Sequence, residues 1–431
     1  MKLYLDNPQI ETDFEAVKAS LPGLADLRRQ AMARFTQSGI PGPKVEEWKY
    51  TNLGFLAREN YLPAGKSGRQ AEIRQFFDQA HIKDIPGPVV VFINGYFNAD
   101  LSSLPEEDGV DFSVLSHNPG NFHQSLQASE GSSSLNDLNR ALVTDGYRLD
   151  IAPDVDVEHA VQIIHIATSG TEMASLRTRG QVKLGRGAKA AIIETFIGAE
   201  EARYWFHMIS DMVLESGACA SFGQFQLQGR NAIHMTELHT EVSDHATFNH
   251  VNLQLGAEIS RTELINSFTG EYASINLSGA YLGRARQSHD IFTRINHDRP
   301  NCKSRQLFRG VLDKGGKSAF QGKVVVARDA RKTNADQSDK TLLLDRGAVA
   351  NAKPELLIYA DDVKCSHGAT VGEVDPDQLF YLRSRGLDED AAKGLLVEAF
   401  VSEVFDDLEN ERVAEKFRQY AAGWLRKEGA L

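Results

Sequence analysis

The feature that most limits the fold of this chain is a long central region almost free of proline. The 200 residues from 154 to 353 contain one proline, Pro300, and little helical periodicity. They contain instead many short runs rich in Val, Ile, Phe and Thr, such as VQIIHIAT, FHMISDMVLES and SAFQGKVVVARDA, which Gly, Asp, Asn and Ser separate. Runs of this kind are typical of β-strands. The region is therefore predicted to be mainly β.

Small-residue turns recur through this region at a nearly constant spacing. Gly187, Gly217 and His245 follow one another at intervals of roughly 30 residues, within the range of about 20 to 45 that is typical of solenoid repeats. At roughly 25 residues per turn and about 4.8 Å per step, the region would form on the order of eight turns and ~40 Å of solenoid. Sandwiches and barrels also contain many short strands, so these folds stay open at this point.

Helical segments are predicted on both sides of the β region. Between Glu11 and about Ser38 the apolar residues follow the spacing of one amphipathic helix, and the polar stretch that lasts until about Tyr147 predicts mixed helix and loop. After the β region, Asp375 begins a helix that ends at Gly386, and two more helices follow in a small bundle. The chain is divided into an N-terminal helical and mixed domain (1–150), a β-solenoid core (151–374) and a C-terminal helical domain (375–431).

Composition and charge exclude several classes of protein. With 42% hydrophobic and 25% charged residues, the chain is expected to be folded and soluble. A net charge of −12 without a basic cluster argues against nucleic acid as a partner. The chain shows no signal-peptide pattern and no apolar run of about 18 residues, so no membrane association is expected and the expected location is the cytoplasm. The three cysteines, Cys219, Cys302 and Cys365, lie far apart, which predicts neither disulfides nor a self-contained zinc site.

The stretch DDVKCSHGATVG, residues 361 to 372, contains the main candidate for chemistry. In an extended strand Cys365 and His367 point to the same side, with Cα atoms about 6.6 to 6.8 Å apart. Thiolate and imidazole suit iron, copper or zinc, but an iron–sulfur cluster generally takes about four ligands. A packed core cysteine beside a hydrogen-bonded histidine is the commoner outcome for such a pair. Because this strand is the last before the helices, its free edge must be covered by the helical tail or by a partner, which would bring further ligands.

Three other motifs do not predict an enzyme. GVLDKGGKS, residues 310 to 318, has Val311 where a P-loop needs glycine, so we interpret it as a turn between strands and expect no ATP hydrolysis by this chain alone. Four histidines between 234 and 250 match no zinc signature. Asp361 and Asp362 face opposite sides of a strand, which argues against a stand-alone carbohydrate-active β-helix, the main enzymatic alternative.

Residues 305 to 387 resemble the core of the SufB/SufD family of iron–sulfur cluster assembly proteins. The resemblance includes the run QSDKTLLLDRGAVANAKPELLIYADDVKCSHGATVGEVDPDQLFYLRSRGL, and EEWKYTNL (46–53) resembles the family's N-terminal motif. By composition alone, that second motif would be an aromatic cluster that docks the N-terminal segment on the body. YADDVKCSHGATVG is similar to the SufD branch rather than the SufB branch. The resemblance implies a right-handed parallel β-helix flanked by N- and C-terminal helical domains.

The same resemblance implies a function and partners. The chain would be a scaffold subunit rather than an enzyme, pairing with SufB through the edge of the β-helix and binding the SufC ATPase through its C-terminal helices. The complex would build nascent iron–sulfur clusters and transfer them. His367 matches the family histidine proposed as a cluster or iron ligand, and Cys365 matches the neighbouring cysteine. The cluster would be shared with SufB and not held stably by this chain alone. The candidate SufC contacts are Leu379, Phe380, Tyr381, Leu382, Arg383 and Arg385.

Two alternatives stay open. A purely structural partner of SufB would contribute no cluster or iron ligand. The helix that contains Leu379, Phe380 and Leu382 could also be an ordinary amphipathic helix packed on the end of the solenoid. The resemblance does not decide the cluster type, the acceptor proteins, the use of a flavin by the complex, or whether the isolated chain forms a homodimer through the same edge.

Overall fold

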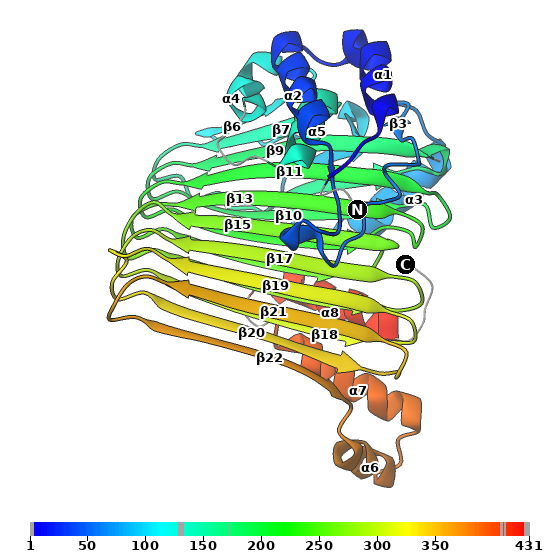
Figure 1. Cartoon of the computed structure of the whole chain (residues 1–431), viewed down its shortest axis with the longest axis vertical. Coiled ribbons are helices and arrows are strands. Elements are labelled where there is room, and N and C mark those ends of the chain that lie inside the picture. The colour runs from blue at the N-terminus through cyan, green and yellow to red at the C-terminus, as the bar shows by residue number, and fades with distance from the viewer. Residues whose placement is uncertain (1–3, 128–132, 172, 406–407, 409–410, 426–431) are drawn as a thin grey trace.

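The computed structural model describes residues 4–127, 133–171, 173–405, 408 and 411–425. Its centre is a solenoid of two facing, mainly parallel sheets (Figure 1). Each coil adds one strand to each sheet, so the strand pairs from β8 and β9 to β20 and β21 make seven coils and β22 begins an eighth. The predicted parallel β-helix and its number of turns are therefore confirmed, and a sandwich or barrel is excluded.

We name the two sheets after their last strands. The β22 sheet contains β4 (Val89–Ile93), β5 (Tyr96–Phe97), β8 (Val161–Ala167), β10 (Lys189–Gly198), β12 (Cys219–Leu227), β14 (Thr247–Gln254), β16 (Ser274–Gly283), β18 (Lys303–Leu312), β20 (Asn334–Leu343) and β22 (Lys364–Glu373). The β21 sheet contains β3 (Leu62–Pro63), β6 (Val110–Val114), β7 (Asp145–Ile151), β9 (Ala174–Leu184), β11 (Tyr204–Leu214), β13 (Ile233–Val242), β15 (Ile259–Phe268), β17 (Ser288–His297), β19 (Lys317–Val326) and β21 (Val349–Ile358). The pairs β4–β5 and β6–β7 are antiparallel, and every other pair within the two sheets is parallel.

The repeat seen in the sequence is a turn that stacks from coil to coil. Gly187, Gly217 and His245 all have a positive φ, of 69°, 72° and 57°. Glycine adopts this conformation without steric cost, and histidine tolerates it better than most residues. The backbone amide of each donates to a carbonyl one coil further on: Gly187 to Ser216 (2.9 Å), Gly217 to Asp244 (2.8 Å) and His245 to Glu271 (2.9 Å). The spacing of these turns in the sequence is thus the length of one coil.

The core fills the space between the two sheets. Alternate residues along each strand are buried there, including Phe222, Phe308 and Phe320. Full burial of a Phe side chain stabilises the fold by about 1.5–3 kcal/mol. Close packing also fixes some glycines, since a Cβ at Gly310 would lie 2.2 Å from the ring of Tyr281. Because side chains two apart along a strand share a face, the residues that fill the core recur at every second position.

The N-terminal helices gather at the end where the solenoid begins (Figure 1). The prediction of a single helix from Glu11 to Ser38 is wrong. Pro22 and Gly23 (φ 48°) interrupt the segment, because proline cannot continue a helix. The region also contains strands β6 and β7, where the sequence predicts only helix and loop. The remaining elements there are β1 (Tyr4–Leu5), α1 (Pro8–Val17), α2 (Ala25–Ser38), β2 (Ile40–Pro41), α3 (Gln70–Ala80), α4 (His123–Leu126) and α5 (Ser134–Leu142).

The EEWKYTNL segment (46–53) crosses the outer face of the β21 sheet. The guanidinium of Arg261 lies 4.0 Å from the centre of the Trp48 ring, and the Thr51 hydroxyl donates to the Asp290 carboxylate. Glu46 forms an ion pair with Lys353 in β21. The interpretation of this motif as a docking segment is confirmed, and its contacts reach from β15 to the last strand of the sheet.

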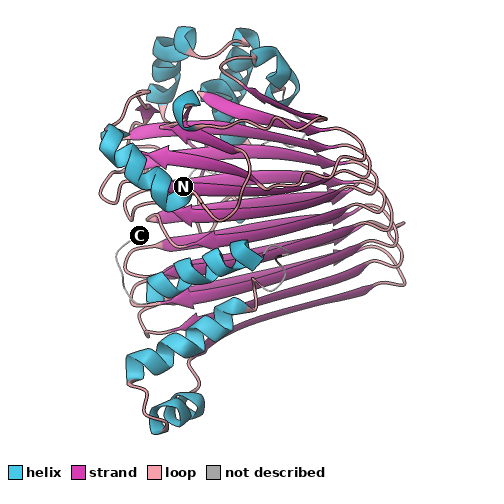
Figure 2. Ribbon diagram, turned by 180° about the vertical axis from the view of Figure 1, so that it is seen from behind, coloured by secondary structure: helices cyan, strands magenta, loops and turns pink. Residues whose placement is uncertain are grey.

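The C-terminal helices are α6 (Pro376–Ser384), α7 (Glu389–Ser402) and α8 (Glu411–Leu425). As predicted, α6 begins at Asp375, whose carboxylate accepts from two backbone amides, and ends before Gly386, which has a φ of 98°. Helices α7 and α8 do not form a bundle with its own core. They lie on the outer face of the β22 sheet (Figure 2), where Phe417 packs against Phe225.

The division of the chain at residues 150 and 374 stays a prediction. Strand β4 lies before residue 151, β7 crosses the boundary at its last residue, Ile151, and both pair with solenoid strands, whereas β22 ends at Glu373. Within the described ranges, no helix combines the length and the apolar character needed to cross a bilayer.

Candidate functional site

The end of the solenoid formed by β21 and β22 is the candidate functional site. Each is the last strand of its sheet, so one edge of each has no neighbouring strand within the described chain. Every residue of β22 is exposed except Cys365, which is half-buried. An uncovered edge offers a row of backbone N–H and C=O groups to another chain. The last coil is therefore suited to a protein partner.

Exposed large apolar side chains gather around this end. Of the thirteen found among the described residues, nine lie between residues 349 and 395. Contiguous exposed apolar surface on a protein commonly marks an interaction site. These nine are Val349, Leu357, Ile358, Tyr359, Val371, Phe380, Tyr381, Leu387 and Leu395.

His367 lies on the interior face of the last coil. It pairs in register with Gln337 of β20, which is 1% exposed and faces the core. Side chains at paired positions of parallel strands point to the same side, so the imidazole faces the extension of the core. It is exposed because no further coil covers it. Neither ring nitrogen makes a hydrogen bond to the residues that the structure describes, so the imidazole is available to a ligand.

Cys365 lies on the same face, as predicted, but in different surroundings. It pairs with Ala335 and packs beside Val324, Val326 and Ala360. Burial raises the pKa of the Cys365 thiol above its ordinary value. Because the thiolate is the form that binds a metal, the free Cys365 thiol is less ready to lose its proton than an exposed one. The structure places the two residues on the same face of β22, with His367 exposed and Cys365 half-buried.

Helix α6 carries the candidate SufC contacts, and it extends beyond β22 (Figure 1). Phe380 is 74% exposed and Tyr381 56% exposed, so Phe380 does not pack on the end of the solenoid and that alternative is wrong for it. Leu379 and Leu382 are half-buried, whereas Arg383 and Arg385 are exposed. The Arg385 guanidinium donates to the Tyr381 hydroxyl at 3.1 Å. Aromatic and arginine side chains share one exposed helix, a composition typical of binding hot spots.

The GVLDKGGKS motif connects two strands. It runs from the end of β18 to the start of β19, and Gly315 has a φ of 75° in the turn between them. The interpretation of this motif as a turn is confirmed.

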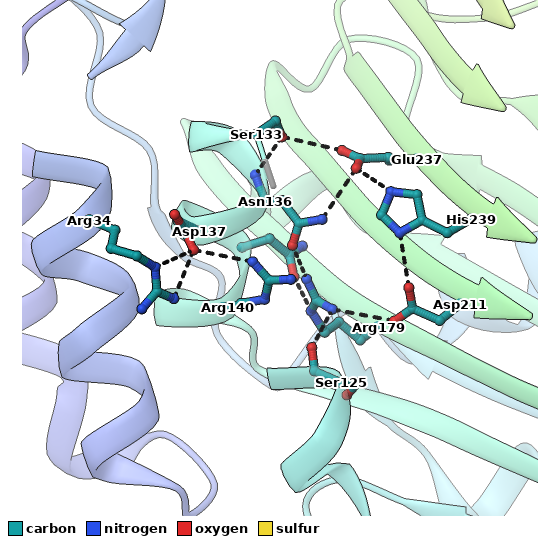
Figure 3. Close-up of polar contacts among 11 residues, drawn as sticks. Arg34, Ser125, Ser133, Asn136, Asp137, Arg140, Arg179, Asp211, Glu237 and His239 are labelled. Carbon is teal, nitrogen blue, oxygen red and sulfur yellow. Dashed lines mark hydrogen bonds and ion pairs between the residues drawn. The ribbon is translucent and has the colours of Figure 1, made fainter. Parts of the chain in front are cut away.

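A cluster of polar side chains lies between α5 and the β21 sheet (Figure 3), and no pattern in the sequence predicts it. His239 lies between Asp211, 3.0 Å from Nδ1, and Glu237, 2.6 Å from Nε2. Burial alone would lower the pKa of His239, but these hydrogen bonds raise it to about 10. Both ring nitrogens of His239 are therefore engaged by carboxylates of the protein itself. Glu237 also accepts from Asn136 of α5 at 3.2 Å, and Asp211 is the in-register partner of His239 on the preceding coil.

Comparisons with known proteins agree with this architecture. A family model described as "SUF system FeS cluster assembly, SufBD core domain" matches residues 165–400, and the SufBD N-terminal region matches residues 8–163. The chain therefore belongs to the SufBD family of the SUF system for iron–sulfur cluster assembly.

Within that family the chain is similar to proteins named SufD. It is 27% identical over 394 residues to the iron–sulfur cluster assembly protein SufD of Escherichia coli (strain K12), over 90% of each chain. It is 24% identical over 417 residues to SufD of Bacillus subtilis (strain 168), over 91% of this chain and 92% of the other. A SufBD family protein of Synechocystis is 27% identical over 433 residues, 95% of each chain.

Proposed function

We propose that this chain is the SufD-type subunit of a cytoplasmic scaffold, which pairs with SufB, binds the SufC ATPase, and builds and transfers nascent iron–sulfur clusters. The observation that carries the proposal is the uncovered last coil. It combines two free strand edges, exposed apolar side chains and an interior face that presents His367. A partner with a similar open coil would continue both sheets and enclose the imidazole in the seam.

The cluster is cargo shared across that seam. His367 would bind iron as a neutral imidazole, through the nitrogen that carries the lone pair. Among the described residues, no three His, Cys, Asp or Glu side chains are grouped as metal ligands, so the remaining ligands in this proposal come from SufB. A cluster bound in this way would leave when the seam opens. The same edge would be open to a second copy of the chain when SufB is absent.

ATP hydrolysis by SufC would act on the seam through α6. Helix α6 follows β22 after two residues, so a movement of α6 is transmitted to the strand that contains His367. The exposed Phe380 and Tyr381 are the proposed contacts of SufC. Hydrolysis belongs to SufC in this scheme, and this chain transmits the movement without catalysing a reaction.

Pairing at the last coil can be tested with Val371→Asp. Val371 is exposed in β22, and a buried, unpaired carboxylate in the seam is unfavourable. We expect native mass spectrometry of the co-expressed proteins to show at least tenfold less complex with SufB. The matched control is Val213→Asp, because Val213 is similarly exposed on β11 in the middle of the solenoid. Equal complex formation by the two variants would contradict the proposal.

A purely structural role beside SufB is the second candidate. One observation favours it: Cys365 packs in an apolar cluster and its thiol pKa is raised, so half of the sequence motif is not prepared for metal binding. The two candidates differ in the fate of the cluster when His367 is replaced in an intact complex. Flavin use, cluster type and acceptor proteins lie outside the proposal.

A further inference from the structure

Buried polar side chains directly beneath the last coil have unused hydrogen-bonding atoms. Among the described residues, Gln337 Oε1, Asp339 Oδ2 and Gln306 Nε2 have no partner, although all three side chains are buried. Buried polar groups are normally hydrogen-bonded, because an unpaired one is costly. Two of these atoms, Gln337 Oε1 and Asp339 Oδ2, are acceptors without donors on the strand next to the one that contains His367, and Gln306 Nε2 is an unpaired donor one coil deeper.

Gln337 is the acceptor aligned with His367. The two residues are in-register partners of β20 and β22 and face the same side. The side-chain amide of Gln337 donates deeper into the core, to Gln306 Oε1 at 3.4 Å, and Gln306 accepts in turn from Thr293 at 2.6 Å. Because the amide nitrogen is engaged below, the carbonyl oxygen of Gln337 remains unused.

The packing around Gln337 provides space for its amide. A Cβ at Gly322 of β19 would lie 1.6 Å from Gln337 Nε2, which no residue other than glycine could accommodate without a shift. Asp339 is less well placed as an acceptor for His367. Its in-register partner is Ala369, and its other oxygen accepts from the Tyr281 hydroxyl at 2.9 Å.

We propose that Gln337 is a positioning residue for His367: the two side chains are not bonded in this structure, but a rotation of the imidazole would let Gln337 Oε1 accept the N–H of one ring nitrogen and leave the lone pair of the other facing the open end. Metal-ligating histidines usually donate their second N–H to such an acceptor, which fixes the tautomer and the ring orientation. The inference deepens the proposed function, since it rests on His367 as the iron ligand. It predicts a preferred His367 tautomer before any cluster is bound.

The tautomer of His367 is measurable by NMR on the full-length chain with isotope-labelled histidine, using a His367→Ala sample to assign the signals. At pH 8 we expect one tautomer to predominate. Gln337→Leu removes the acceptor and should reduce this preference roughly two- to tenfold. Gln337→Glu retains an acceptor oxygen and should preserve the preference. Thr341→Val is the matched control, because it removes a buried hydroxyl of β20 that is bonded to Tyr281 and not to Gln337, and it should leave the tautomer ratio as in the wild type.

The outcomes separate this inference from the proposed function. A wild-type tautomer ratio equal to that of Gln337→Leu would overturn the positioning role. If Gln337→Leu does not fold, the comparison of wild type with Gln337→Glu decides, and a mixed ratio in both proteins overturns the inference. In the complex with SufB and SufC, Gln337→Leu should slow cluster formation, and Gln337→Glu should restore it. Unchanged cluster content in His367→Ala would instead reject the ligand role and leave the tautomer result standing.

Discussion

One half-buried and one buried side chain illustrate how stacked coils control protonation at the scale of a single residue. His239, which is half-buried, receives a carboxylate from its own strand and another from the strand one coil earlier, and these hydrogen bonds raise its pKa to about 10. Asp339 lies in an environment that favours its neutral form, because burial raises the pKa of its carboxyl group to about 7. Each also has a hydrogen-bond partner one or two coils away in the sequence: Asp211 lies 28 residues from His239, and Tyr281 lies 58 residues from Asp339.

Replacement of His239 by Gln should destabilise the protein in a pH-dependent manner. The folded-state pKa of His239 is raised from 6.5 to about 10, so its stabilising contribution is complete below pH 6.5 and is lost as the pH rises toward 10. We expect the free energy of unfolding to fall by roughly 1–3 kcal/mol at pH 6 and by much less at pH 10. Denaturant titrations at both pH values measure this, with the exposed His123→Gln in α4 as control. An equal loss at both values would contradict the account.

Asp339→Asn should stabilise the protein above neutral pH. In the unfolded chain this carboxyl ionises near its ordinary pKa of 3.8, whereas in the folded chain it keeps its proton to about pH 7. The wild type therefore loses stability as the pH rises from about 4 to 7, and the neutral amide does not. We expect the unfolding free energy of the variant to exceed that of the wild type by roughly 1–3 kcal/mol at pH 8, since a buried charge is avoided. A variant less stable than the wild type at pH 8 would show that the Asp339 carboxylate is stabilised in the fold, against this prediction.

At the scale of secondary-structure elements, the sequence predicts those turns and helix ends that depend on residues close together in the chain. The coil repeat is visible because a stacked turn needs residues that tolerate a positive φ, such as Gly187 and Gly217. The start of α6 is visible because Asp375 caps it. The break in the first helix is less visible, since the apolar spacing continues past Pro22.

Long-range contacts between elements leave no comparable pattern. Thr51 reaches Asp290, 239 residues away, and α8 docks on β12 through Phe417 and Phe225. For the candidate site, sequence resemblance indicates Cys365 and His367. It does not indicate their different burial, or the alignment of Gln337 with His367, because these depend on the register of β20 and β22.

Replacement of Phe380 and Tyr381 in α6 by Ser should weaken SufC binding without loss of stability. Both side chains are exposed in the isolated chain, so the melting temperature should change by no more than about 2 °C. We expect the affinity for SufC to fall at least tenfold, the usual effect of losing a hot-spot aromatic. Calorimetry or surface capture measures the affinity, with Leu104→Ser, an exposed leucine of the N-terminal region, as the control. Retained affinity in the double variant would move the SufC site away from α6.

At the scale of the whole molecule, the solenoid is asymmetric. The N-terminal helices gather at its first coils, α7 and α8 cover one outer face, and the last coil is left uncovered (Figures 1 and 2). The EEWKYTNL segment connects the two ends, because Glu46 pairs with Lys353 in the last coil. The surface left for a partner in this arrangement is the one that presents His367.

The most direct test of the account is the iron and acid-labile sulfide content of the complex after anaerobic co-expression with SufB and SufC. Wild type, His367→Ala and the control His245→Ala are compared, and native mass spectrometry verifies that each complex is intact. The account predicts that His367→Ala loses most of its iron and sulfide while the control retains both. Undiminished iron and sulfide in an intact His367→Ala complex would contradict it and assign the cluster ligands to SufB alone.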